Sequence, residues 1–331
     1  MQRLWESVSR VPFHVDPEAI CYTRSLAYHT AFSEDTLNVV DKSNVTFHRD
    51  SITCPELSEV PKAELWRQLW MDIKAQKRCQ ISALVVKSDD NSIRIPPTPG
   101  YVPHFPEVST QIIVASKDHL TDLHIDNGKD VLSAVVDVCR KIFVLYPPTT
   151  KNLRLLDGVE NEPFRLATIC QKLEGALYSE VTSSKAIVIP AGTLHAVITI
   201  VGGTLISKDF YTVGTLAPMS RWIATSKASM NRISLHEQEA RRIIDCWITA
   251  AHVVLADRTA LSIVSALIEA SSMIAMLLRR ANNRGGLQRS LQKLFKSLSS
   301  GIYWAELTPM QKETYVSRVR QCGNDLGLSL E

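Results

Sequence analysis

The sequence predicts a mainly β protein with added helices, in which a β-sandwich or barrel occupies the middle third of the chain. Short, apolar, β-rich segments follow one another between residues 109 and 216, and clusters of Gly, Pro, Asn and Asp separate them. After residue 217, apolar residues recur instead at the spacing of helices. We therefore expect three regions, at 1–108, 109–216 and 217–331.

The region 1–108 is predicted to be a mixed α/β layer that packs on the barrel. Residues 63–75 (AELWRQLWMDIKA) have the apolar spacing of a helix, and residues 80–86 (QISALVV) form an apolar strand. Five prolines between residues 95 and 108 predict a loop or an extended connection.

The region 109–216 is predicted to hold the β core. Its expected strands contain the segments QIIVAS, LTDLHID, VLSAVVDV, KIFVLYP, KAIVIP, HAVITIV and TLISKDFYTV. No convincing helix is expected over most of this region. Many short strands between turns are typical of sandwiches and barrels, jelly rolls and cupins among them.

The region 217–331 is predicted to be helical. Capping-box patterns begin at Ser234 and Thr308, and one helical face carries Leu287, Leu291, Leu294, Phe295 and Leu298. The apolar segment 260–278 contains Glu269 and four serines, so a buried or interface helix is favoured over a membrane span. A homodimer surface is one reading of this segment.

Composition limits the classes of function. The 331 residues are 45% hydrophobic and 21% charged, with a net charge of +3, which predicts no general attraction to nucleic acid or to an anionic membrane. The seven cysteines are scattered without a C-x-x-C pair, so neither a structural zinc site nor a disulfide framework is expected. The N-terminus has no apolar run of signal-peptide length, and we expect a cytoplasmic protein, with the nucleus as the alternative.

Three side chains from two distant segments form a candidate metal site. His124 and Asp126 stand two residues apart in an expected strand, so both side chains point to one face. His195 follows a Pro-x-Gly turn in another expected strand. Two imidazoles and one carboxylate on one face of an ion suit non-haem Fe(II), and Lys141 is placed to bind the far carboxylate of a co-substrate.

These residues resemble the motif of the JmjC-type Fe(II)/2-oxoglutarate-dependent oxygenases of the cupin superfamily. In that family an H-x-D/E pair is followed by a strand of the form K-x-W-x-x-x-P-P and then by a distal histidine. Here the pair is followed by Lys141, by Pro147-Pro148 and by His195. The resemblance covers residues 110 to 212 and implies a double-stranded β-helix, or jelly-roll, core.

The resemblance also implies a reaction. Fe(II) would be held by His124, Asp126 and His195. The far carboxylate of 2-oxoglutarate would pair with Lys141 and with the hydroxyl of Thr121. With O2 as the third reactant, decarboxylation of 2-oxoglutarate would be coupled to oxidation of a substrate C–H bond.

Some positions depart from the family pattern or extend it. Ser207 stands where demethylase-like members carry a Ser that lines the co-substrate pocket. Asp209 stands where those members carry an Asn, which adds a negative charge near the site. Phe143 replaces the usual Trp, a change compatible with packing.

The substrate is not determined by these patterns. A stand-alone core with a helical C-terminal region favours an amino acid or another small metabolite as the substrate. The alternative within the family is a hydroxylase of protein or peptide side chains or a lysine demethylase. A cupin-like metal enzyme that uses no 2-oxoglutarate and a non-catalytic interaction module are the alternatives outside it.

Overall fold

The computed structural model describes most of the β core and part of each flanking region. The described residues are 2–16, 45–49, 52–53, 60–79, 81–88, 109–126, 129–210, 212–215, 284–299, 307–328 and the single residues 218, 221, 222, 225, 271 and 275. The capping box predicted at Ser234 and the helix predicted at 260–278 lie outside this part of the chain, apart from Ser271 and Ala275. The predicted dimer surface at 260–278 therefore stays a prediction.

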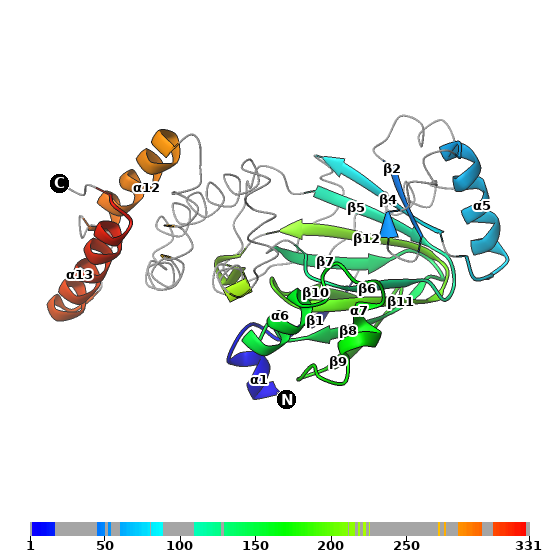
Figure 1. Ribbon diagram of the computed structural model, residues 1–331, viewed down its shortest axis with the longest axis horizontal. Coiled ribbons are helices and arrows are strands. Elements are labelled where there is room, and N and C mark those ends of the chain that lie inside the picture. Colours follow the sequence, from blue (N-terminus) through cyan, green and yellow to red (C-terminus); the bar gives the residue numbers. More distant parts are fainter. Residues whose placement is uncertain are drawn as a thin grey trace. The chain divides into compact units, whose positions relative to one another are not determined.

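The described strands form two antiparallel sheets (Figure 1). The larger has eight strands in the order β1-β10-β7-β12-β5-β4-β2-β3. Their bounds, in chain order, are Phe13–Val15 (β1), Val45–Arg49 (β2), Ile52–Thr53 (β3), Ile81–Ser88 (β4), Ser109–Ala115 (β5), Asp130–Val135 (β7), Ala186–Ile189 (β10) and Gly203–Phe210 (β12). The smaller sheet has the order β6-β11-β8-β9, with bounds Leu120–His124 (β6), Arg140–Tyr146 (β8), Leu177–Val181 (β9) and Leu194–Val201 (β11).

The eight consecutive strands from β5 to β12 are divided equally between the two sheets. Strands β5, β7, β10 and β12 lie in the larger sheet, and β6, β8, β9 and β11 form the smaller one (Figure 1). A chain that crosses between two antiparallel sheets in this way forms a jelly roll. The predicted mainly β class with a jelly-roll core is confirmed.

The space between the sheets is filled by apolar side chains. The residues of this core are Trp5, Val131, Val135, Cys139, Phe143, Leu145, Val181, Ile187, Ile189, Val197 and Leu205. Trp5, from the first helix, α1 (Gln2–Glu6), is fully buried among them and donates its indole N–H to the carbonyl of Gly175 at 2.9 Å. The N-terminal segment thus contributes to the core of the jelly roll.

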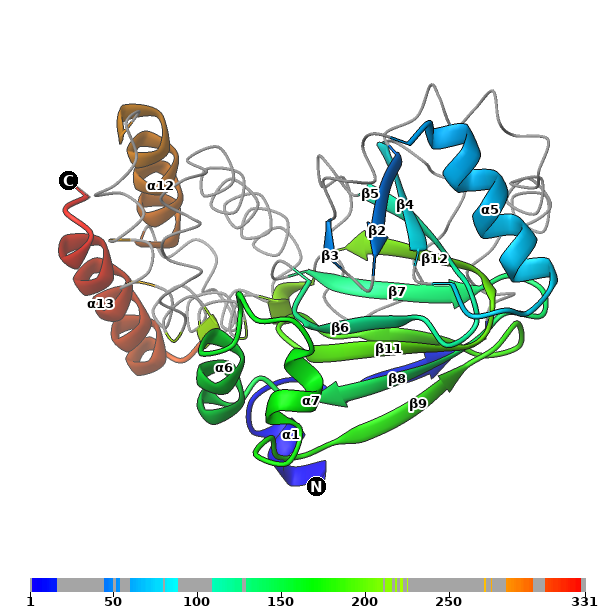
Figure 2. The ribbon, with the colours of Figure 1, turned by 45° about the vertical axis from the view of Figure 1, so that its right-hand side comes forward.

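The larger sheet extends beyond the jelly roll through β4, β2 and β3. Helix α5 (Lys62–Lys74) packs beside this extension, with Leu65, Trp66, Leu69 and Ile73 buried against strand residues (Figure 2). The helix predicted at 63–75 is α5, and the strand predicted at 80–86 is β4. These strands belong to the same sheet as the core, and the division into three regions stays a prediction.

Two short helices connect β8 to β9 where no helix was expected. They are α6 (Thr150–Asp157) and α7 (Arg165–Ile169). The hydroxyl of Thr149 caps α6 by accepting the backbone N–H of Asn152 at 3.1 Å. Helix α7 has no such local cap, because its N-terminal residue, Phe164, has no side-chain acceptor; its backbone is left-handed, with φ of 60°.

The chain divides into two compact units, and the C-terminal helices belong to the second. The first unit comprises residues 1–98 and 106–210, and the second comprises 99–105 and 211–331. In the second unit, the short helix η3 (Val213–Thr215) is followed by α12 (Arg284–Ser299) and α13 (Pro309–Asp325), which pack against each other. Leu291, Leu294, Phe295 and Leu298 are buried, and the capping box predicted at Thr308 is present.

No helix in the described part of the chain is both long and apolar enough to cross a membrane.

Candidate metal centre and its pocket

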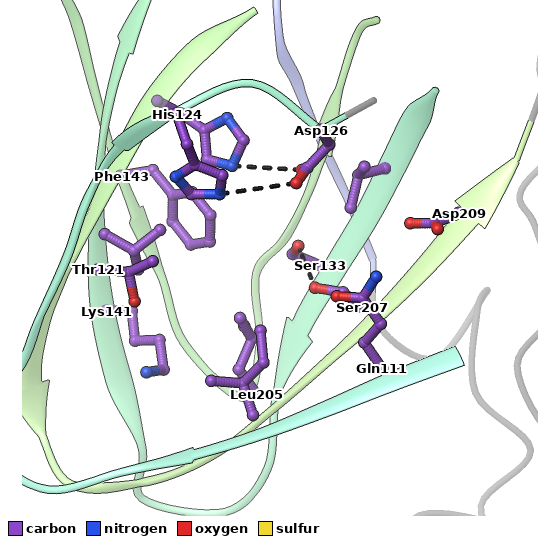
Figure 3. Close-up of a pocket in the computed structure, with 14 residues that line it drawn as sticks. Gln111, Thr121, His124, Asp126, Ser133, Lys141, Phe143, Leu205, Ser207 and Asp209 are labelled. Carbon is purple, nitrogen blue, oxygen red and sulfur yellow. Dashed lines mark hydrogen bonds and ion pairs between the residues drawn. The ribbon is translucent and has the colours of Figure 1, made fainter. Parts of the chain in front are cut away.

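His124, Asp126 and His195 meet at one end of the smaller sheet. Strands β6 and β11 pair antiparallel, and His195 is the partner of His124 in that register. The Nε2 atoms of His124 and His195 lie 3.6 Å and 3.3 Å from the two carboxylate oxygens of Asp126 (Figure 3). One donor atom from each residue lies within 4.8 Å of the others, a set that can hold a metal ion.

Asp126 reaches this cluster from outside the strand. Strand β6 ends at His124, so the prediction that His124 and Asp126 share one strand face was wrong. The side chain of Asp126 comes instead from the turn that follows β6, and 32% of it is exposed. The grouping of the three ligands therefore depends on the path of the chain after β6.

Backbone carbonyls orient both imidazoles. Nδ1 of His124 lies 2.7 Å from the carbonyl oxygen of Asp122, and Nδ1 of His195 lies 3.1 Å from that of Thr193. A carbonyl can only accept, so each Nδ1 carries a proton and Nε2 is the ring atom that faces Asp126. Hydrogen bonds of this kind fix the tautomer and the ring plane of metal-ligating histidines.

The charge of Asp126 is stabilised in the absence of a metal. Burial alone would raise the pKa of this carboxyl, but the charges and hydrogen bonds of His195 and His124 hold the pKa well below its ordinary value. Burial likewise opposes protonation of His195, yet Asp126 raises the pKa of that imidazole above its ordinary value. A carboxylate kept ionised between two imidazoles is the donor set that a divalent cation requires.

Lys141 is buried in the same pocket. It lies on β8, is 1% exposed, and donates a hydrogen bond from Nζ to the Thr199 hydroxyl at 2.8 Å. Burial lowers the pKa of Lys141, and Cys139 opposes that shift. The described residues show no ion pair for this ammonium group, and a buried cation is costly without an anion.

The pocket lies between the two sheets and has a cavity volume of about 60 Å³. Thr121 and Lys141 project into it from the smaller sheet, on the same side as His124 (Figure 3). Gln111, Ser133 and Ser207 line the opposite wall (Figure 3). The remaining lining residues are Ile113, Asp126, Val131, Phe143, His195, Val197, Leu205 and Asp209.

The wall opposite Lys141 carries a row of polar side chains. Ser207 of β12 pairs with Gln111 of β5 on one side and with Ser133 of β7 on the other. The two serine hydroxyls hydrogen-bond at 2.8 Å. Of these residues only Ser207 was predicted, because nothing in the local sequence shows that β5, β12 and β7 are neighbours.

Asp209 is buried on the same wall, and a cation accompanies it. Its carboxylate is 2.9 Å from Nζ of Lys129, a residue that was not predicted to take part. The side chain of Asp209 is 5% exposed and that of Lys129 is 23% exposed. The negative charge that was expected here is therefore matched by a positive one.

Another unpredicted residue, Asp122, supports His124 from the side away from the metal ligands. Its carboxylate accepts the backbone N–H groups of Leu123, Arg165 and Leu166 at 2.6–2.9 Å. Asp122 thus caps α7 from a distant strand, while its carbonyl orients the ring of His124. This role could not be read from the sequence because the capped helix starts more than forty residues later.

Comparison with known proteins agrees with this geometry. The chain is 31% identical over 113 residues to JmjC domain-containing histone demethylation protein 1 of Saccharomyces cerevisiae, and 31% identical over 110 residues to the protein of the same name from Kluyveromyces lactis. These matches and the donor set support a JmjC-type member of the cupin superfamily. No protein-family model matches the sequence.

The similarity to these JmjC proteins is partial. The alignments cover 34% and 33% of this chain, and 23% of each relative. The chain therefore aligns with less than a quarter of each relative's length. JmjC proteins in general use Fe(II) and 2-oxoglutarate, and the His124, Asp126 and His195 donor set fits such an ion.

We predict that Mn(II), an inert substitute for Fe(II), raises the melting temperature of the protein. A ligand present at a hundred times its Kd stabilises the folded state by about 2.7 kcal/mol. The increase should disappear in His124→Ala, and differential scanning fluorimetry with and without Mn(II) measures it. His14→Ala, which replaces an exposed histidine outside the site, is the matched control and should keep the increase. A His124→Ala protein that keeps the full increase would contradict the proposed metal site.

His119, just before β6, provides a prediction on pH. Burial, together with the charges of Lys141 and His48, lowers the pKa of His119 from 6.5 to about 4. The unfolded chain therefore takes up a proton below pH 6.5 that the folded chain does not, and stability falls until the pH reaches about 4. In His119→Leu this decrease in the free energy of unfolding, up to about 3 kcal/mol, should be absent. Urea unfolding of the metal-free proteins at several pH values measures it, and parallel pH curves for the two proteins would contradict the prediction.

Proposed function

We propose that this chain is an Fe(II)- and 2-oxoglutarate-dependent oxygenase of the JmjC type, which couples decarboxylation of 2-oxoglutarate to oxidation of a substrate C–H bond. One observation carries the proposal. A buried lysine, Lys141, and a His-Asp-His cluster line the same pocket. A ligand with a metal-chelating end and a distant carboxylate has groups that complement both, and 2-oxoglutarate is such a molecule.

The residues of the chain divide the binding work between them. His124, Asp126 and His195 would hold Fe(II) on one face and leave the remaining positions for the co-substrate and O2. The ammonium of Lys141 would pair with the C5 carboxylate of 2-oxoglutarate, and the Thr121 hydroxyl would donate to the same group. The iron, when bound, supplies the oxidative chemistry, and the protein supplies orientation and a site shielded from bulk water.

Phe143 contributes to that shielding. It is 1% exposed on β8, and its ring lies nearly parallel to the imidazole of His195, with centroids 6.5 Å apart. An aromatic ring at this position limits the movement of His195 and excludes water from the inner side of the metal site. The replacement of Trp by Phe therefore keeps an apolar ring beside the histidine.

Ser207 and Asp209 are retained as co-substrate contacts within this proposal. Both line the pocket from β12, two residues apart on one face. Ser207 already hydrogen-bonds Ser133, and Asp209 already pairs with Lys129. Their contribution would therefore be to close the wall of the pocket that faces Lys141, with the hydroxyl of Ser207 as the group free to rotate toward a ligand.

The names of the two relatives favour a protein or peptide side chain as the substrate, with removal of a lysine methyl group as the outcome. That substrate would place the protein in the nucleus. The amino acid or small metabolite expected from the sequence, and a cytoplasmic location, are the alternative. Both classes fit the same iron and 2-oxoglutarate chemistry, so they differ only in what enters the pocket mouth.

We predict that Lys141→Met sharply weakens 2-oxoglutarate turnover. Loss of a hydrogen-bonded charge pair costs about 1.5–3 kcal/mol, which corresponds to a roughly ten- to hundredfold loss of co-substrate affinity. Succinate released in the presence of Fe(II), ascorbate and 2-oxoglutarate measures the effect. Met also relieves the folded chain of an uncompensated buried charge, so the variant should remain folded.

Lys151→Met is the control for this variant, because Lys151 forms an exposed ion pair with Glu174 outside the pocket. It should leave succinate release unchanged. Equal turnover by Lys141→Met and the wild type would favour a cupin-like metal enzyme that does not use 2-oxoglutarate. If Mn(II) does not raise the melting temperature of the wild-type protein, a non-catalytic interaction module is favoured.

We predict that methylated lysine peptides stimulate 2-oxoglutarate turnover and release formaldehyde. An N-methyl group becomes an unstable hydroxymethyl group once its C–H bond is oxidised, whereas other C–H bonds give stable alcohols. Peptide libraries read by mass spectrometry and formaldehyde assays distinguish the two outcomes. Stimulation by free amino acids alone would instead support the metabolite alternative.

A further inference from the structure

We propose that Lys129 is a positioning residue for the metal ligand Asp126, and that it acts through its buried ion pair with Asp209. The inference rests on the proposed metal site. Asp126 lies between β6 and β7, outside both strands. The two histidines are positioned by strand pairing, but Asp126 is not.

Asp126 has less structural support than the two histidines with which it clusters. His124 is the last residue of β6 and His195 is the second residue of β11, and they are partners in one ladder. Asp126 lies two residues beyond the end of β6 and outside any strand. Its position is therefore set by the turn, and a turn residue is free to move unless contacts restrain it.

The restraint comes from the residues that follow Asp126. The backbone N–H of Lys129 donates to the carbonyl of Asp126 at 3.2 Å, which closes the turn. The side chain of the same residue donates from Nζ to Oδ2 of Asp209 at 2.9 Å, on β12 of the larger sheet. Lys129 thus connects the backbone of the proposed metal ligand to a strand of the jelly roll.

The next residue provides a second connection. Asp130 is fully buried and begins β7, and its Oδ1 accepts hydrogen bonds from Arg10 at 2.5 Å and from the backbone N–H of Ala191 at 2.8 Å. Ala191 lies in the turn that leads to His195. Asp130 therefore connects the start of β7 to the turn before His195. Among the described residues that follow Asp126, Lys129 is the one that connects the chain nearest Asp126 to β12.

Burial makes the Lys129–Asp209 pair suited to this task. A carboxylate that is 5% exposed is strongly unfavourable without a cation, so the ammonium of Lys129 is held at Asp209 and not released to solvent. An exposed ion pair would restrain the turn far less. The pair also keeps the carboxylate of Asp209, which lines the pocket, engaged with a protein cation instead of a metal.

The test measures the affinity of the metal-free protein for Mn(II), by electron paramagnetic resonance of the free ion, in Lys129→Met and Asp209→Asn. Positioning and electrostatics predict different results. If charge alone mattered, removal of the lysine would strengthen binding of a cation and removal of the aspartate would weaken it. If the pair positions Asp126, both variants weaken binding, by at least about tenfold, as is usual when the support of a metal ligand is lost.

Lys151→Met is the matched control, since it breaks the exposed pair with Glu174 and should leave Mn(II) affinity within about twofold of the wild type. Should Lys129→Met fail to fold, the double variant Lys129→Met/Asp209→Leu removes both buried charges at once and should fold with weakened Mn(II) binding. Unchanged or tighter Mn(II) binding by Lys129→Met, or by the double variant, overturns the inference while leaving the proposed function intact. A wild-type protein that binds no Mn(II) overturns both.

Discussion

The antiparallel pairing of β6 with β11 is the constraint on which the candidate site depends. It makes His195 the partner of His124 although some seventy residues separate them, and it places two imidazoles 4.2 Å apart between ring centroids. The same pairing also places Thr121 opposite Val197, further along the two strands from the histidines. Every other group of the site is placed with respect to this ladder: Lys141 and Phe143 through β8, on the far side of β11, and Asp126 through the turn after β6.

The two ends of the smaller sheet carry charges of opposite sign. The metal cluster carries a carboxylate that two imidazoles keep ionised, and the opposite end of the smaller sheet carries the ammonium of Lys141. These two ends are separated along the sheet by the neutral side chains of Thr121 and Phe143. Burial of an ionised group is unfavourable unless a partner of opposite charge is present, so a metal cation at one end and an organic anion reaching the other would relieve both costs at once.

Much of this could be predicted from the sequence, and several of the failures have a common origin. The β-rich middle third, the helix α5, the capping box at Thr308 and the group His124, Asp126, Lys141 and His195 all follow from local pattern or short motifs. What could not be predicted depends on the order of strands in the sheets. Ser133, Lys129 and Asp130 find their partners 74, 80 and 120 residues away, because β7 lies between β10 and β12 in the larger sheet. Helix α7 was missed for the same reason, since its cap, Asp122, comes from β6.

The two walls of the pocket have different chemical roles under the proposed function, and the difference bears on substrate selection. The smaller sheet and its adjoining turn supply all the groups assigned to the metal and to the far carboxylate of the co-substrate. The larger sheet supplies a polar row, Gln111, Ser207 and Ser133, beside an aspartate that Lys129 neutralises. That wall can donate and accept hydrogen bonds but offers little net charge. His124 and Asp126 are about one-third exposed while His195 is buried, so access to the metal is on the side of the first two residues. Under the proposed function, a substrate would reach the metal from the side of His124 and Asp126, which is also the side on which the proposed Lys129–Asp209 restraint acts.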